Sequence, residues 1–341
     1  MKQSFVKQTK SYLVVLGLIV SLFYFKTWLA PQPNLHIAKK KDTLWTPYYQ
    51  IRDTMVLSEI ENIVSKTRKN NKVDPIVKKH IEDLKRKQIL SPDFNLQNLG
   101  QTAHALVVQR NTTLTKIEEM RIQSCVETAS RDRSKSNVGF FGKNEFIRRN
   151  HHSYLNNEKI MIEIGGNWGW DAGNFSKLFN PRYIILEPLE DYVKILEKKF
   201  AKNPQVVIYK LGLGATNEKL MVKLEGNNAC ATSKFSGVKG DVPIYISNAI
   251  DFFTDLGVGI YDVDLLTMNC EGCEYEVLET LVKTNMISRF RNIQWGTHSS
   301  LKGLQHPFSR YCRIQEILSR THRPTYHYKF IWESWRRLDV R

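Results

Sequence analysis

From residue 158 onward, short apolar runs alternate along the chain with stretches whose apolar positions recur at helical spacing. Apolar runs bounded by turn residues predict buried strands, and the amphipathic stretches between them predict crossover helices. Such alternation is typical of an α/β protein with a parallel sheet. Strands are predicted at residues 160–164, 183–186, 206–209, 264–268 and 291–295, with additional strand material at 219–224 and 242–246.

The segments between these strands contain clear helical patterns. Residues 174–179 belong to a helix that ends before Pro181, and residues 191–200 place Tyr192, Leu196 and Phe200 on one side of a helix. A further helix is predicted at residues 274–282, behind the fourth strand. The aromatic tail, residues 324–335, predicts a closing hairpin, and the basic segment 101–157 predicts a helical lead-in to the domain at 158–341.

The N-terminal segment has the pattern of a signal anchor. A basic tail, residues 1–11, precedes an apolar stretch at residues 12–30. This stretch reaches the length of a membrane span if Lys26 snorkels and Trp28 lies in the interface. A cleaved signal peptide is the alternative, but Trp28 stands where a small residue is preferred. The pattern predicts a type II membrane protein whose domain faces the lumen of the Golgi or endoplasmic reticulum.

Charge changes this picture little. Lys and Arg number 50 against 34 Asp and Glu, a formal net charge of +16, with much of the excess in the predicted stem, residues 31–100, and at 131–149. Zinc-finger spacing and RNP-like aromatic motifs are lacking, so no nucleic-acid partner is expected. The basic runs are interpreted as a solvated surface.

The ends of the first two predicted strands carry candidate chemistry. The first ends at Glu163 and continues into the glycine-rich loop GGNWG at residues 165–169. Glycines let a backbone approach a ligand closely, and the following helix N-terminus offers free N–H groups. The second strand ends at Glu187, about 20 residues after the glycines, where a carboxylate grips ribose hydroxyls. The loop differs from the dinucleotide fingerprint and better suits a nucleoside cofactor without a pyrophosphate.

These segments resemble the FkbM-domain family of S-adenosylmethionine-dependent methyltransferases. The most specific part is DLLTMNCEGCEYEVL at residues 264–278, together with EIGGNWG at 163–169 and LEP at 186–188. The resemblance implies a Rossmann-like class I methyltransferase fold with a seven-stranded, mostly parallel sheet. It also implies S-adenosylmethionine as cofactor and a hydroxylated small molecule or glycan as acceptor. Predicted cofactor-binding residues are Glu163, Gly165, Gly166, Asn167, Gly169, Glu187, Leu211, Gly212 and Asn269; no metal is expected.

The acceptor region departs from the family pattern. Asn269 and Thr267 stand where the family has Asp and Lys, and Gly296 stands where it often has Glu. His298 and Glu271 are the candidate bases that would take a hydroxyl proton. Their structural alternatives are a hydrogen-bonding histidine and a carboxylate that caps the following helix. The leading function is O-methylation in the secretory pathway, and the alternative is a membrane-anchored binding protein that has lost catalysis.

Five cysteines are present, an odd number, and one or two disulfides are compatible with a lumenal domain. Cys270 and Cys273 have C-x-x-C spacing, but no second close pair completes a four-cysteine zinc site. Packing in the core is the favoured interpretation of this pair, and a disulfide is the rival.

Overall fold

The computed structural model of the protein describes residues 103–226 and 231–340. The predicted tail, membrane anchor and stem all lie outside these residues. Within the described ranges, none of the helices has the length and apolarity that a membrane crossing requires.

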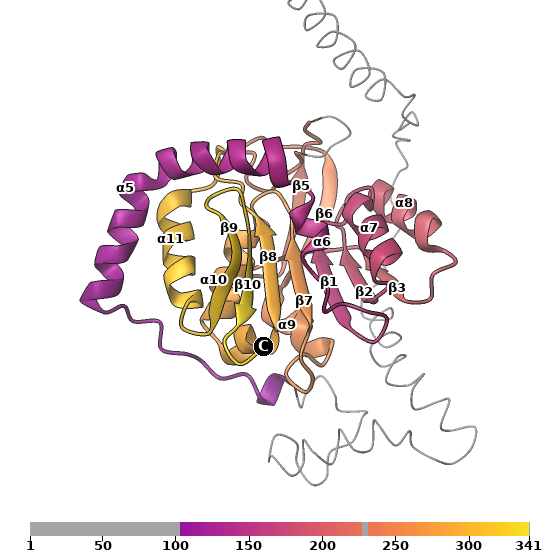
Figure 1. Ribbon diagram of the computed structural model, residues 1–341. Coiled ribbons are helices and arrows are strands. Elements are labelled where there is room, and N and C mark those ends of the chain that lie inside the picture. The colour runs from indigo at the N-terminus through magenta and orange to yellow at the C-terminus, as the bar shows by residue number, and fades with distance from the viewer. Residues whose placement is uncertain (1–102, 227–230, 341) are drawn as a thin grey trace, which may run out of the picture. The chain divides into compact units, whose positions relative to one another are not determined.

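The main sheet has seven strands, as predicted. They are β1 (Ile160–Ile164), β2 (Arg182–Leu186), β3 (Val206–Tyr209), β7 (Leu265–Met268), β8 (Asn292–Gly296), β9 (His322–Tyr328) and β10 (Trp332–Arg337). Their order is β3-β2-β1-β7-β8-β10-β9 (Figure 1). β10 runs opposite to the other six strands of this sheet, and it forms with β9 the hairpin expected at the C-terminus. The prediction of a mostly parallel sheet is confirmed.

A second, three-stranded sheet adjoins the carboxyl end of the first. It contains β4 (Gly212–Gly214), β5 (Glu218–Val222) and β6 (Val242–Asn248) in the order β4-β6-β5. β5 and β6 correspond to the additional strand material predicted from the sequence, whereas β4 was not predicted. Gly212 and Leu213 of β4 pair with Ile246 and Ser247 of β6, which places apolar side chains of both strands near the ends of the main strands.

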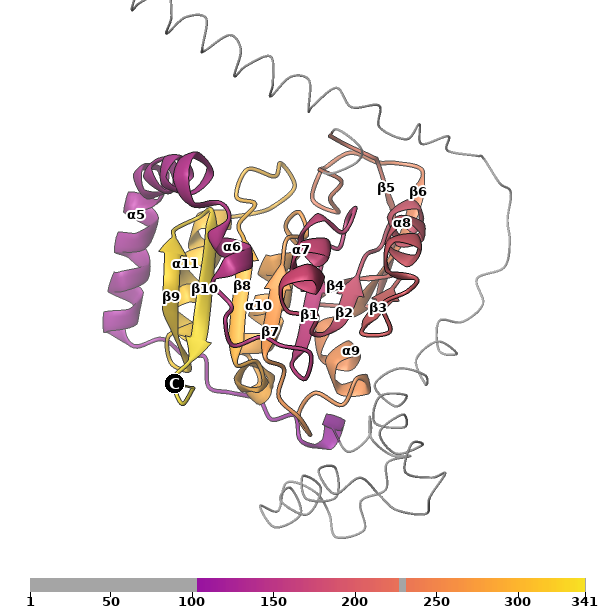
Figure 2. The ribbon, with the colours of Figure 1, turned by 45° about the vertical axis from the view of Figure 1, so that its right-hand side comes forward.

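Helices cover both faces of the main sheet (Figures 1 and 2). On one face lie α7 (Trp170–Leu178) and α8 (Glu190–Phe200), whose Phe175 and Leu196 share a core cluster with Met161 and Ile185 of the strands. The opposite face carries α10 (Cys273–Val282) and α11 (Pro307–Leu318). A short helix, α9 (Ala249–Asp255), follows β6, and a 3₁₀ turn, η6 (Asn285–Arg289), precedes β8. The described residues thus form a three-layer α/β domain.

The segment expected as a helical lead-in contains α5 (Lys116–Gly139), a π-helical turn η4 (Phe140–Asn144) and α6 (Ile147–Asn150). A capping box begins α5, in which Thr115 and Glu118 exchange hydrogen bonds. Glu118 also pairs with Arg320 at 2.9 Å, close to the end of α11. A disulfide between Cys125 and Cys312 joins α5 to α11 covalently. These contacts fix the lead-in to the outer edge of the domain.

Replacing both Cys125 and Cys312 with serine is expected to destabilise the fold by about 2–5 kcal/mol, because this cross-link constrains a large loop of the unfolded chain. The loop is large because the two cysteines are 187 positions apart. Denaturant unfolding without reductant measures the loss. The matched control replaces Cys270 and Cys273, whose bond closes a span of only three positions and so constrains the unfolded chain less. Equal losses in the two double variants would contradict the prediction.

Candidate active site

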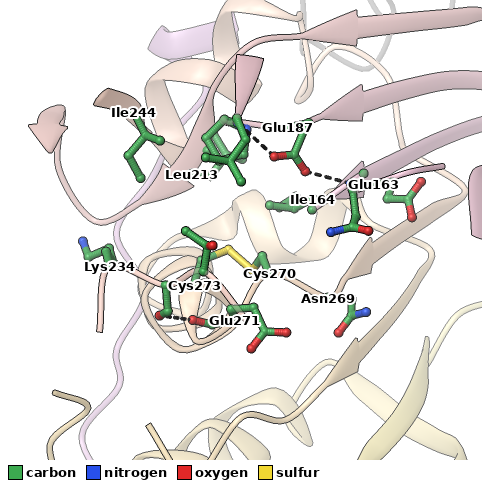
Figure 3. Close-up of a pocket in the computed structure, with 18 of the residues that line it drawn as sticks. Glu163, Ile164, Glu187, Leu213, Lys234, Ile244, Asn269, Cys270, Glu271 and Cys273 are labelled. Atoms are coloured by element: carbon green, nitrogen blue, oxygen red, sulfur yellow. Dashed lines mark hydrogen bonds between the residues drawn. A yellow bond between two sulfur atoms is a disulfide. The ribbon is translucent and has the colours of Figure 1, made fainter. Parts of the chain in front are cut away.

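A pocket of about 370 Å³ opens at the carboxyl ends of β1, β2 and β7 (Figure 3). The chain runs outward from β1 to β3 and then returns to the other side of β1 as β7. Ligands of open α/β sheets bind at such a switch point. Leu213 of β4 and Ile244 and Ile246 of β6 form an apolar wall of the pocket. The second sheet therefore closes one side of the site.

The loop after β1 passes very close to the loop after β7. Gly165 has φ +93°, and a Cβ at this position would lie 2.2 Å from the backbone oxygen of Asn269. A Cβ on Gly166 would lie 2.4 Å from the side chain of Ile185. Only glycine fits this positive φ and this close approach without strain. The two glycines therefore let the β1 loop form the floor of the pocket.

Glu187 presents its buried carboxylate to the pocket from the end of β2 (Figure 3). One carboxylate oxygen accepts the backbone N–H of Asn167 at 2.7 Å, and the other accepts that of Leu189 at 2.9 Å. Burial raises the pKa of Glu187 to about 7. A carboxylate oxygen accepts more than one hydrogen bond, so Glu187 retains capacity for donors on a ligand.

Glu163 lines the same pocket but does not cap the loop amides. Its carboxylate accepts a hydrogen bond from the Tyr183 hydroxyl at 2.6 Å, while Glu187 serves the amide of Asn167. Burial, followed by the nearby charge of Asp171, raises the pKa of Glu163 to about 8. The folded protein without ligand therefore holds a proton on this side chain through the neutral range.

We expect Glu163 to make the protein less stable as the pH rises. An acid whose pKa is higher in the folded than in the unfolded chain binds protons more tightly when folded, so its contribution declines between the two pKa values. For Glu163 this decline extends from about pH 4.5 to about pH 8. In Glu163→Gln, the decrease in unfolding free energy between pH 4.5 and pH 8 should be smaller than in the parent by about 2–4 kcal/mol. Glu190→Gln, at an exposed residue of α8, should keep the parental slope. Identical slopes in all three proteins would refute the assignment.

The loop between β7 and α10 is organised by Glu274. One oxygen of this buried carboxylate accepts the N–H of Gly272 at 3.0 Å, and the other accepts the backbone N–H of His298 at 2.9 Å. Glu271 and Gly272 both have positive φ, at 52° and 102°. A Cβ on Gly272 would lie 2.6 Å from Leu301. This turn directs Glu271 toward the pocket (Figure 3).

The structure places His298, one of the two candidate bases, between two carboxylates. Its Nδ1 lies 2.9 Å from Glu274 and its Nε2 lies 3.2 Å from Glu271. Burial acts to lower the pKa of His298, but the charges of Glu274 and Glu271 and their hydrogen bonds outweigh it and raise the pKa to about 10. An imidazolium cannot accept a proton, and His298 does not line the pocket. Its geometry suits holding Glu271 in place.

Trp332 fills the space beside Gly296, the position at which the family that the sequence resembles often has a glutamate. A Cβ on Gly296 would lie 2.6 Å from the ring of Trp332 and 3.1 Å from the side-chain oxygen of Asn269. A glutamate cannot be accommodated there without moving Trp332. Asn269 itself lines the pocket from the end of β7.

Arg148 reaches the pocket from α6 and was not predicted. Its guanidinium lies 3.2 Å from Asp171 and 4.9 Å from the centroid of the Trp332 ring. The backbone oxygen of Arg148 accepts hydrogen bonds from Gln294 at 3.0 Å and from His152 at 3.1 Å. The buried Nε of Arg148 has no hydrogen-bond partner among the described residues. Asp171 and Trp332 therefore hold a cation in the wall of the pocket.

Cys270 and Cys273 form a disulfide, which corrects the favoured interpretation that they pack in the core as free thiols. Both cysteines line the pocket (Figure 3). The bond was the rival interpretation, and spacing alone did not decide between the two. In the described part of the chain, no three His, Cys, Asp or Glu side chains are grouped to hold a metal ion.

Most of the residues predicted for the site do line the pocket. They are Glu163, Gly165, Gly166, Asn167, Glu187, Gly212, Asn269 and Glu271. Gly169 instead allows α7 and α8 to approach, since a Cβ there would lie 2.7 Å from Leu196. Leu211 is buried and does not line the pocket, whereas Leu213, two residues later, does. Pocket residues that were not predicted are Arg148, Ile164, Trp170, Asp171, Pro188, Leu189, Leu213, Thr232, Ser233, Lys234, Ile244, Ile246, Cys270 and Cys273.

The strand order, the single antiparallel strand and the pocket at the switch point define a class I methyltransferase fold. No profile of a known protein family matches the chain, and no curated protein sequence matches it. Similar solved structures include the FkbM methyltransferase of Methylobacillus flagellatus, at 12% identity and TM-score 0.37, over 71% of this chain and 59% of that one. This chain thus corresponds to about three fifths of that protein.

Two further structures are similar to the chain. Fibrillarin of Aeropyrum pernix, solved with natively bound S-adenosylmethionine, is 9% identical, with TM-score 0.30, over 54% of this chain and 67% of that one. The precorrin-6y C5,15-methyltransferase of Geobacter metallireducens is 12% identical, with TM-score 0.30, over 58% of this chain and 90% of that one.

Proposed function

We propose that the protein is an S-adenosylmethionine-dependent methyltransferase. The observation that carries the proposal is Glu187, a buried carboxylate at the end of β2 that faces the same pocket as the glycine loop after β1. A vicinal diol offers two O–H donors, and an acidic side chain in this position is suited to accept them. The pocket has no phosphate-binding glycine fingerprint, which favours a nucleoside over a dinucleotide.

The residues present fit such a cofactor along the length of the pocket. Glu187 would hold the ribose, and Leu213, Ile244 and Ile246 would pack against the adenine. The close approach at Gly165 would let the β1 loop contact the middle of the ligand. The guanidinium of Arg148, which lines the pocket, would bind the carboxylate of the methionine part.

When bound, the cofactor supplies a methyl group already activated by its sulfonium, so catalysis is largely a matter of positioning. Glu271 is the proposed base, since its carboxylate lines the pocket where an acceptor hydroxyl would approach. His298, lying between Glu271 and Glu274, would fix the orientation of Glu271. This assigns His298 a positioning role.

The proposed acceptor is a hydroxyl of a glycan or small molecule, and the proposed setting is the lumen of the endoplasmic reticulum or Golgi. The setting rests on the apolar segment at residues 12–30 and on the Cys125–Cys312 disulfide, since such bonds persist in oxidising compartments. The glycan rests on this setting and on the tendency of the family that the sequence resembles.

The part of the site around Gly296 and His298, where the methyl acceptor would lie, favours a second function, that of a binding protein. Trp332 occupies the space of the missing acid at Gly296, and His298 is already paired with two carboxylates. A binding protein that keeps the cofactor pocket but no longer transfers methyl groups would have these features.

Calorimetric titration of the full chain with S-adenosylmethionine and S-adenosylhomocysteine tests the proposal. Binding of both is expected, and absence of binding would refute the methyltransferase. Mass spectrometry of glycans from cells with and without the protein then tests turnover. A methyl group missing without the protein supports the enzyme, whereas binding with unchanged glycans supports the binding protein.

Arg148→Gln should weaken S-adenosylhomocysteine binding by about 10- to 100-fold, the effect of losing one charge-assisted hydrogen bond. Binding of 5′-methylthioadenosine, which lacks the carboxylate, should not change. Arg149→Gln is the matched control, because Arg149 pairs with the same Asp171 at 3.3 Å but does not line the pocket. Equal weakening of both ligands would show that Arg148 acts on the pocket as a whole.

A further inference from the structure

The Cys270–Cys273 disulfide lies in the wall of the pocket, within the turn that carries Glu271 (Figure 3). Cys270 is partly exposed, whereas Cys273 is buried as the first residue of α10. A thiol that enters the pocket therefore meets the sulfur of Cys270 first. The proposed methyl transfer uses neither cysteine.

Two features of this bond favour its reduction, although the buried carboxylate of Glu274 lies 3.5 Å from the Cys270 sulfur. The bond closes a span of three positions, so it gains little from constraining the unfolded chain. Cys273 lies at the N-terminus of a ten-residue helix, where free amides and the helix dipole stabilise a thiolate. The Cys125–Cys312 bond has neither feature, since it spans 187 positions and its Cys312 is buried inside α11.

Reduction would alter the pocket through the residue next to Cys270. Two thiols cannot remain at bonding distance, so one sulfur must move away to van der Waals contact. Cys273 is fixed in the helix, which leaves Cys270 to move. The preceding residue is Asn269, whose backbone oxygen lies against Gly165 of the β1 loop. A shift of Cys270 is thus transmitted to the floor of the pocket.

We propose that Cys270 and Cys273 form a redox-active site for small thiols and dithiols that controls cofactor binding. A thiolate attacks Cys270, and Cys273 leaves as the thiolate. A second thiol of the reductant then resolves the mixed disulfide. Two electrons and two protons pass to the pair, and the reductant is oxidised to its own disulfide. The inference rests on the proposed function, because cofactor affinity is the property that the redox state controls.

Equilibrating the full chain in buffers of graded reduced and oxidised dithiothreitol tests this site. Alkylation and mass spectrometry report the state of each cysteine pair, and calorimetry with S-adenosylhomocysteine reports the affinity. The Cys270–Cys273 pair should be reduced while Cys125–Cys312 stays oxidised. Over that range the affinity should fall by about tenfold, a typical coupling between two sites, and return on reoxidation.

Two double variants sharpen the test. Cys270→Ser with Cys273→Ser should bind weakly at every potential, whereas Cys125→Ser with Cys312→Ser should keep the response. If either variant fails to fold, reversible reduction of the unmodified chain decides the question. Oxidised protein that binds no S-adenosylhomocysteine overturns the proposed function and this inference with it. Equal affinity in both states, or earlier reduction of Cys125–Cys312, overturns this inference alone.

Discussion

Glu187→Ala is expected to weaken binding of S-adenosylhomocysteine by a hundredfold or more. The substitution removes the carboxylate that would accept both ribose hydroxyls, and hydrogen bonds to a charged group contribute about 1.5–3 kcal/mol each. It also leaves the amides of Asn167 and Leu189 without their acceptor. The variant should therefore lose stability as well, by about 1–3 kcal/mol for each amide left buried and unpaired.

Glu187→Gln separates these two effects. Its side-chain oxygen still accepts one loop amide, so the loss of stability should be about half that of Glu187→Ala, while the charge-assisted bonds to the ribose are lost. Calorimetry measures the affinity, and thermal unfolding measures the stability. Glu190→Gln removes a charge three residues later, from an exposed side chain paired with Lys194 and Lys210, and should leave the affinity unchanged and lower the stability by no more than about 1 kcal/mol. Near-parental affinity in Glu187→Gln would remove Glu187 from the cofactor site.

The central strands of the sheet were predictable from the sequence because β1 and β7 are buried on both faces. Such strands appear as continuous apolar runs, and the predicted run at 160–164 coincides with β1. The predicted run at 206–209 coincides with β3, an edge strand that is only partly buried. The pairing of β10 between β8 and β9 was not derivable from the pattern of apolar positions, because a hairpin can add to a sheet by either strand.

Two of the elements that were missed, β4 and α9, have weak local patterns, whereas α11 is a twelve-residue amphipathic helix that was overlooked although its apolar positions recur at helical spacing. β4 is only three residues long, GLG, and exists because it pairs with β6. α9 is seven residues long and depends on the side chain of Asn248, which caps it by accepting two backbone amides. Short elements of this kind are stabilised by tertiary contacts more than by their own propensity.

The site was predictable where it lies at strand ends and not where it comes from elsewhere. Parallel strands bring their carboxyl ends to one edge, which is why Gly165, Glu187 and Asn269 meet. Arg148 lies in a helix before the sheet, and Ile244 in a second sheet, so their positions follow only from the folded chain. The carboxylate partners of His298 could not be predicted either, because they depend on the same tertiary packing.

Gly165→Ala should disrupt both the fold and the pocket. The added Cβ would lie 2.2 Å from the backbone oxygen of Asn269, and a backbone contact of this kind cannot be relieved by rotating a side chain. The residue would also have to keep φ +93°, which side chains rarely adopt. Strain at such a position costs about 1–3 kcal/mol before the clash is counted.

We therefore expect the Gly165→Ala variant to unfold at much lower denaturant concentration, or to part the loops after β1 and β7 and lose cofactor binding. Gly142→Ala is the matched control, because a Cβ at Gly142 meets no atom within 4 Å and its φ is not positive. That change should leave both properties near the parental values. If Gly165→Ala keeps the parental stability and the parental affinity, the loops after β1 and β7 do not approach as closely as the structure places them. The β1 loop would then not form the floor of the pocket.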